Sequence, residues 1–487
     1  MALERAVFAR DTFFHPAVVP FRQNEVRAVL ASADSAEIPG SACFGPYISG
    51  SLGGKWYGGL SPMLDLSAEA TDQGSALFRT AGGIQASLRY GDKLEIFGAF
   101  FGGFERAPAY INAFSDSLGV LPGLGRNRGS GDLSAFALPA FAVMYSPSRY
   151  FQVDAGFGTN SFGSGYRSLL LSDAAYNYPY LKLTTDVWRF KYTNLFAAMT
   201  HIGDEAVRSE NFRPKYTATH HLSWAVSRRV TVSVFESVLW QGSDSLSDRG
   251  FDPHYLNPVI FYRPVEFAMG SPDRMLVGAD VQVRLGKKAA LYGQFMLDEF
   301  LLENLRERNG WWANKWGIQA GATVFDPLGL EGLRLQGEFN VVRPFTYSHG
   351  SPLQSYTHFN QPLAHPLGSN FYEAVFFADY ERGTWFAGSH TVVSRYGRDG
   401  GANMGGNIFR SYANPEMIFG NRIAQGIRND LVFQRVSVGK VIHRKMNLRL
   451  SLRATVRALS TDGGSFETEA FAGISLSTGF FNRYRDF

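Results

Sequence analysis

The sequence predicts an all-β transmembrane barrel of about 18 antiparallel strands, and three observations support this fold class. Apolar and polar residues alternate with a period of two in segments along the whole chain. Tight turns and long connections also alternate, from the first predicted strand pair to the last. The composition combines 15% aromatic residues and 52 glycines with only 18% charged residues, which disfavours both a disordered chain and a helical bundle.

The alternation is clearest in four segments, 82–90, 277–285, 333–341 and 448–457. Because successive side chains on a strand point to opposite faces, each segment has one apolar and one polar face. We expect Leu335 and Leu450 to face lipid. Six arginines lie on the polar faces and are expected to line the lumen: Arg89, Arg284, Arg334, Arg449, Arg453 and Arg457.

The connections predict the topology. Tight links are expected around residues 91–92, 146–148, 186–187, 227–228, 286–287, 327–329, 382–383 and 443–444. Long connections are expected at 106–133, 158–178, 202–215, 241–272, 300–312, 344–370 and 397–429. Outer-membrane barrels show this pattern, with short periplasmic turns and long extracellular loops. An opening strand near 54–70 and a closing strand near 465–481 complete an even number, which places both termini in the periplasm.

The two ends of the chain are predicted to differ from the barrel. Residues 1–45 do not alternate and are expected to form an N-terminal periplasmic or plug segment, with a short helix over 24–33. Residues 46–487 form the predicted barrel, with a loop helix over 301–308. The final Phe487 matches the usual last residue of outer-membrane barrels, but it breaks the parity of the last strand. A bulge or a short tail would explain this break.

Several protein classes are excluded. No window of 18 apolar residues exists, so a transmembrane helix is not expected. The first residues are too charged for a signal peptide, so the barrel would be a mature form without its leader. The single Cys43 excludes an intramolecular disulfide and a multi-cysteine zinc site. A net charge of +4 over 487 residues predicts no nucleic-acid partner, and no metal or other cofactor is expected.

Four motifs carry a family resemblance. The first is Phe-Gly-Ser-Gly-Tyr-Arg-Ser-Leu-Leu-Leu-Ser-Asp at 162–173, followed by 178–183, and the second is Tyr-Leu-Asn-Pro-Val-Ile-Phe-Tyr-Arg-Pro at 255–264. The third is Leu-Tyr-Gly-Gln-Phe at 291–295, which leads to Leu-Asp-Glu-Phe at 297–300, and the fourth is Tyr-Thr-His-Phe-Asn-Gln-Pro-Leu-Ala-His-Pro-Leu-Gly at 356–368. Over about 150–410 the chain resembles the capsule-assembly (Wzi-type) outer-membrane family. It is most similar to the Bacteroidetes branch with gliding-motility proteins of the RemB type. The resemblance implies an 18-stranded barrel in outer-membrane lipid, with a blocked lumen and a non-enzymatic role in holding surface polysaccharide.

The candidate glycan ligands lie mainly in these motifs. They are Tyr166, Arg167, Ser168, Asp173, Asn257, Tyr262, Arg263, Asp298 and Glu299. Arginine offers a planar fork of donors to sugar hydroxyls or to an acidic saccharide. The alternative is structural, with Arg167 and Asp173 paired internally to hold the loop. Lumen arginines would likewise pair with Asp280, Glu338 and plug residues.

Other functions stay open at this point. The main alternative is a structural subunit of a gliding-motility or protein-secretion complex, with other envelope proteins as partners. A diffusion porin is a second alternative, since periodicity does not decide whether the lumen is open. A hydrolase with Ser172 as nucleophile is a third, but no Gly-x-Ser-x-Gly motif supports it. We therefore expect no enzymatic activity.

Overall fold

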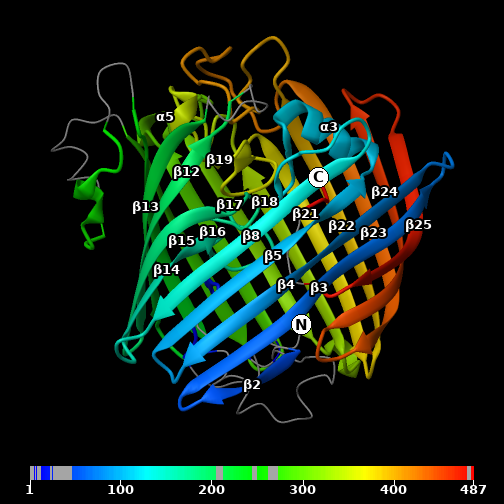
Figure 1. The fold of residues 1–487 in the computed structure, drawn as a ribbon. Helices are drawn as coiled ribbons and strands as arrows, with labels where there is room; N and C mark the ends of the chain where they lie inside the picture. Colours follow the sequence, from blue (N-terminus) through cyan, green and yellow to red (C-terminus); the bar gives the residue numbers. More distant parts are fainter. Residues whose placement is uncertain are drawn as a thin grey trace.

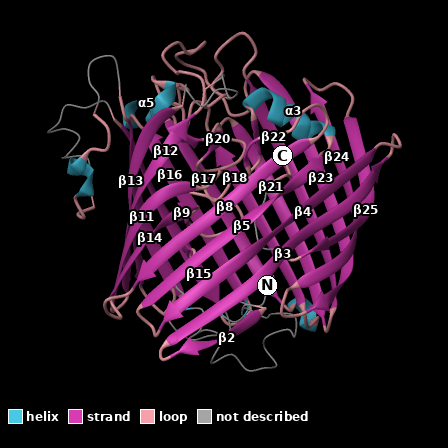
Figure 2. Ribbon diagram, viewed as in Figure 1, coloured by secondary structure: helices cyan, strands magenta, loops and turns pink. Residues whose placement is uncertain are grey.

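The structure is a computed structural model that describes residues 5, 7, 13–21, 25, 47–203, 212–243, 249–260, 273–479 and 484–487. It is a closed barrel of 18 antiparallel strands, which confirms the predicted fold class (Figures 1 and 2). The barrel strands are β3 (Trp56–Thr71), β4 (Ala76–Tyr90), β5 (Leu94–Arg106), β8 (Ser134–Tyr145), β9 (Phe151–Gly158), β11 (Tyr178–Val187), β12 (Phe190–His201), β13 (Arg213–Ala225), β14 (Val230–Gln241), β15 (Arg274–Leu285), β16 (Ala289–Glu299), β17 (Lys315–Phe325), β18 (Leu333–Val342), β21 (Phe371–Arg382), β22 (Trp385–Arg398), β23 (Ile427–His443), β24 (Leu448–Thr461) and β25 (Glu467–Ser477). Strand β25 pairs with β3 and closes the barrel.

The two ends of the barrel differ in their connections. One end, here called the short-turn rim, holds the eight tight hairpins that the sequence predicts, although the third lies at 188–189 rather than 186–187. The other end, the long-loop rim, holds the seven predicted long connections (top of Figure 1). It also holds two short hairpins, 72–75 and 462–466, that the sequence analysis did not predict. These two hairpins flank the closing pair of β25 and β3.

Short helices and a short strand lie at the two rims of the barrel. Helix α3 (Ala109–Leu118) lies in the first long connection, and α5 (Leu302–Arg306) confirms the predicted loop helix. Strand β2 (Ile48–Gly53) pairs with the beginning of β3 at the short-turn rim (Figure 1). Of the helix predicted over 24–33, only Glu25 belongs to the described residues. No helix in the described parts of the chain is long and apolar enough to cross a membrane.

The strands face lipid and lumen as the alternation predicts. Leu335 and Leu450 point outward and are 40% and 37% exposed, and the neighbouring Leu452 is 66% exposed. Arg284 and Arg457, on the polar faces, are buried inside the barrel. An apolar outer surface with a polar interior is what a barrel in a bilayer requires, because lipid cannot hydrogen-bond to polar side chains.

Chain segments fill much of the lumen. Strand β1 (Val18–Val19) pairs there with β10 (Ser161–Phe162), which belongs to the connection 159–177, here called the plug loop. The plug loop and the connection 343–370 pack a continuous apolar core against the inner wall. Its buried members include Phe162, Leu169, Leu170, Leu171, Tyr347, Tyr356 and Leu363. On this side of the lumen the barrel is therefore packed like the interior of a globular domain.

The C-terminus lies inside the barrel and not at the end of a strand. Strand β25 ends at Ser477, and Gly479 then adopts a left-handed φ of 64°. Residues 484–487, here called the C-terminal tail, lie in the lumen, where Phe487 packs against Tyr110 and Phe114 of α3 (label C in Figure 1). Phe487 therefore does not occupy the terminal strand position of other barrels. Its odd parity follows because alternation applies only to residues within the sheet.

The facing of the strands generates a graded prediction. Val436 lies at the centre of β23 and is 46% exposed on the outer face, whereas Leu450 lies close to the short-turn end of β24. We expect Val436→Lys to lower the free energy of unfolding by about 2–4 kcal/mol and Leu450→Lys by about 0–1 kcal/mol, because a buried charge costs most at the bilayer centre. Equilibrium unfolding in lipid vesicles measures both values. Equal losses at the two positions would contradict the assigned depth.

Candidate functional site

The centre of the lumen is an ion-pair cluster built around Arg167 of the plug loop. Its guanidinium group pairs with Glu373 of β21 at 2.9 Å and donates to Asp486 of the C-terminal tail at 3.1 Å. All three side chains are at most 2% exposed. Burial disfavours the charged form of Asp486, but Arg167 and His390 hold the pKa of its carboxyl group well below the usual range. The cluster joins plug, wall and tail.

The backbone around Arg167 is held as firmly as its side chain. Glu338 of β18 accepts hydrogen bonds from the backbone N–H groups of Tyr166 and Arg167, at 2.8 and 3.1 Å. Gly165, with φ of 112°, lies so close that a Cβ atom would stand 2.5 Å from the Glu338 carboxylate. The Gly-Ser-Gly motif is thus explained by close approach of the plug backbone to the wall.

The predicted ligands of the plug loop therefore serve the plug itself. The Tyr166 hydroxyl donates to Asp486, Ser168 contacts Gln294 of the wall, and Asp173 accepts from Tyr484 of the tail. Arg167 is paired with other residues of the protein, as the structural alternative predicted, but Asp173 is not its partner. Glu373 and Asp486 pair with Arg167 instead, because the plug loop directs the guanidinium group toward them. Whether any of these residues contacts a glycan stays a prediction.

The remaining predicted ligands do not gather into one site. Asp298 pairs with Arg274, and Glu299 at the long-loop end of β16 pairs with Lys315. Asn257 lies elsewhere. Its backbone carbonyl oxygen accepts a hydrogen bond from His220, on the outer face of β13. Tyr262 and Arg263 lie outside the described residues. Among the predicted ligands that the structure describes, Glu299 is the most exposed of the ion-paired ones, with 42% of its side chain accessible.

The structure offers no support for catalysis at Ser172. Its hydroxyl is buried and donates to the backbone carbonyl oxygens of Leu363 and Ala364, and no histidine ring among the described residues is hydrogen-bonded to it. A serine nucleophile needs a base in contact with its hydroxyl. Within the described ranges, no group of three or more His, Cys, Asp and Glu side chains is arranged to hold a metal ion.

Lumen arginines pair with carboxylates other than Asp280 and Glu338, although Arg284 does contact the predicted N-terminal plug segment, where its guanidinium group donates to the backbone oxygen of Val7. Asp280 accepts hydrogen bonds from Ser164, and Glu338 from the plug backbone, so neither pairs with the six arginines. Arg334 pairs instead with Asp379 of the adjacent strand β21, and Arg449 with Glu381. These corrections share one cause, because the plug occupies the carboxylates that face it.

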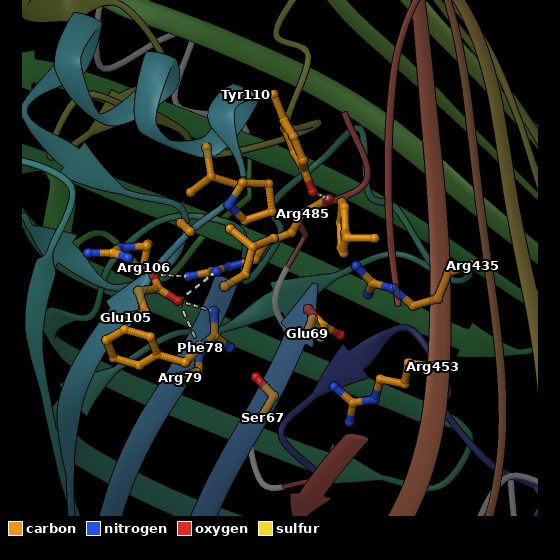
Figure 3. A pocket seen from close by; sticks show the side chains of 15 residues that line it. Ser67, Glu69, Phe78, Arg79, Glu105, Arg106, Tyr110, Arg435, Arg453 and Arg485 are labelled. Atoms are coloured by element: carbon orange, nitrogen blue, oxygen red, sulfur yellow. Dashed lines mark hydrogen bonds and ion pairs between the residues drawn. The ribbon is translucent and has the colours of Figure 1, made fainter. Parts of the chain in front are cut away.

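A second lumen site, the arginine cavity, lies below α3 (Figure 3). It has a volume of about 130 Å³. Its charged lining comprises Arg79, Arg106, Arg435, Arg453, Arg485, Glu69 and Glu105. Of these residues, Arg453 was predicted from the sequence to face the lumen, whereas the others were not. The period-2 pattern of β23 would have placed Arg435 on the same inner face.

Comparison with known proteins shows the fold. No protein-family model matches the chain, and no curated protein sequence matches it. Wzi, a carbohydrate-binding outer-membrane β-barrel involved in group 1 capsule assembly in Escherichia coli, aligns with a TM-score of 0.55 at 10% identity, covering 97% of each chain. OccAB2 of Acinetobacter baumannii and OprD of Pseudomonas aeruginosa align with TM-scores of 0.45 and 0.41 at 10% and 9% identity. They cover 86% of this chain and 97% and 94% of their own.

The class of protein follows from these observations. The chain has the fold of an outer-membrane β-barrel, with its own segments in the lumen. More particularly, the fold is Wzi-like over nearly the whole chain, which agrees with the resemblance of the sequence motifs. The RemB-type branch within that resemblance stays a prediction.

The ion-pair cluster generates a second prediction. Arg167→Leu leaves Glu373 and Asp486 buried without their partner, and we expect a loss of about 3–5 kcal/mol in the free energy of unfolding. A loosened plug should also raise the ion conductance of the protein in planar bilayers. Arg395→Gln is the matched control, because Arg395 pairs with Asp430 while 54% exposed, and a change of at most about 1 kcal/mol is expected. Unchanged stability and conductance of Arg167→Leu would contradict the role of the cluster.

Proposed function

We propose that this protein is a non-enzymatic outer-membrane barrel that binds or organises surface polysaccharide. In the orientation that we propose for the barrel, the short-turn rim faces the periplasm and the long-loop rim faces the cell exterior, as in other outer-membrane barrels. Residues 1–45 act as a periplasmic or plug segment, and the plug loop keeps the lumen closed. The bound polysaccharide is the capsular or related polymer of the same cell.

One observation carries this proposal, namely a lumen that is filled in large part by the protein's own chain. Phe162, Leu169 and Tyr356 are at most 1% exposed in the middle of the barrel. A diffusion porin of this width would instead keep a water-filled channel. The seven long connections at one rim provide a broad surface for a polymer. The fold likeness to a carbohydrate-binding barrel supports the same function.

The alternative is a structural subunit of a gliding-motility or protein-secretion complex. One feature favours it. The segment 249–260 exposes apolar side chains, with Val259 64% and Leu256 44% accessible. Exposed apolar groups at a barrel surface contact either lipid or another protein. Partner envelope proteins would then bind near this segment.

Deletion of the gene tests the proposal directly. We expect cell-bound polysaccharide to fall and released polysaccharide to rise, with the total amount unchanged, because attachment and not synthesis is lost. Fractionation of cells and medium, followed by sugar analysis, measures this shift, and complementation with the intact gene should reverse it. An unchanged distribution, together with co-purification of other envelope proteins, would contradict the proposal and favour the alternative.

A further inference from the structure

The arginine cavity carries more positive charge than its own carboxylates balance. Arg79 donates to Glu105 at 2.7 Å and to Asp65 at 3.2 Å, and Arg485 of the C-terminal tail pairs with the same Glu105 at 2.6 Å. Glu105 is thus shared between two arginines. This part of the lining is neutralised internally, as the dashed lines in Figure 3 show.

Arg106 is exposed and lies 5.9 Å from the centre of the Phe78 ring, and two further arginines, on the opposite wall, are left over. Arg453 forms neither a hydrogen bond nor an ion pair with any described residue, and Arg435 forms one hydrogen bond, from its Nε to the hydroxyl oxygen of Thr455 at 3.2 Å. Arg435 also lies 5.1 Å from the centre of the Phe433 ring. The remaining carboxylate of the lining is Glu69, which attracts Arg453 electrostatically but has no cation of the described residues within ion-pair distance.

The register brings these two arginines together. Arg435 lies opposite Thr455 and Arg453 opposite Ser437, so the two are diagonal neighbours on β23 and β24. Diagonal pairs have Cβ atoms about 7–8 Å apart, within reach of two long side chains that converge on one group. Both side chains point into the cavity (Figure 3). Two converging guanidinium groups repel each other unless an anion lies between them.

The cavity has space for such an anion. Its volume of about 130 Å³ is roughly ten times what one water molecule needs. Gly473 lies in the row between Arg453 and Glu69 and leaves the wall there without a side chain. Apolar side chains form much of the remaining wall, among them Leu77, Phe471 and Ile111. A concave site with apolar walls and a few convergent charges is typical of ligand pockets.

The cavity lies close to the long-loop rim. Leu77 follows the short hairpin 72–75 by two residues, which corresponds to about 7 Å along the strand. The other short hairpin, 462–466, stands beside it across the closing strand pair. The cavity therefore lies near the long-loop rim and below α3, and under the proposed orientation this rim faces the cell exterior.

We propose that Arg435 and Arg453 bind an oxyanion group of an acidic polysaccharide, a sugar carboxylate or a sugar-linked phosphate. Guanidinium groups recognise such groups through paired N–H donors. The inference rests on the proposed function and adds the chemical class of the ligand and the residues that bind it. It also accounts for the excess of arginine over carboxylate in the lining of the cavity.

Calorimetric titration of the purified full chain in detergent tests this inference. The probes are an oligogalacturonate, a neutral oligosaccharide of equal length and inorganic phosphate. We expect the oligogalacturonate to bind more tightly than the neutral oligosaccharide and to lose at least about tenfold in affinity in both Arg435→Gln and Arg453→Gln, since each removes a charge-assisted hydrogen-bonding group. Arg395→Gln, on the outer face of β22, should bind as the unchanged protein does.

Three results would overturn the inference. The first is equal affinity of the variants and the unchanged protein for oligogalacturonate, with all of them folded by heat-modifiability on gels. The second is equal binding of the neutral oligosaccharide. The third is arginine-dependent binding of inorganic phosphate alone, which would assign the cavity to a free anion. If cells that carry either variant still retain their polysaccharide, the ligand assignment fails while the proposed function stands.

Discussion

Compensation of buried charge in the lumen is the constraint on which this structure depends. Arg167 enters from the plug loop, Glu373 from the wall and Asp486 from the C-terminal tail, and none of the three is accessible to water. Each charge would be costly alone, because an unpaired ion in a region of low dielectric constant loses its hydration without a replacement. Plug, wall and tail therefore stabilise one another. The lumen is closed by a set of contacts that forms as a whole.

One side of the lumen is packed with apolar side chains, and the other side holds a charged cavity. From β12 to β21 the inner wall meets the plug in an apolar core, with Leu195, Phe235 and Met296 at most 2% exposed. Around β23 and β24 the filling stops short, and the arginine cavity remains. A closed lumen and a ligand cavity are thus compatible, because they occupy different sides of one barrel. The polysaccharide proposed as ligand need enter only the upper part of that side.

The sequence predicts the barrel well because lipid and lumen impose opposite polarity on alternate residues, as at Leu450 and Arg449. Turn positions follow from the same pattern. Alternation has no bearing on residues that leave the sheet, so the position of Phe487 inside the lumen was not predicted. The partners of Arg167 were missed for a different reason. Glu373 and Asp486 lie 206 and 319 residues away along the chain, and no local pattern indicates such contacts. The proximity of Arg435 to Arg453 likewise depends on strand register, which no local pattern indicates.

The tail also has a mechanical consequence for the barrel. Arg485 is bound to Glu105 of β5, while the backbone oxygen of Phe487 accepts a hydrogen bond from Arg457 of β24. These strands lie on either side of the seam between β25 and β3. The C-terminal tail thus links the strands on both sides of the β25–β3 pair, where the first and last strands of the barrel meet. Lateral separation of β25 from β3 would first have to break these contacts.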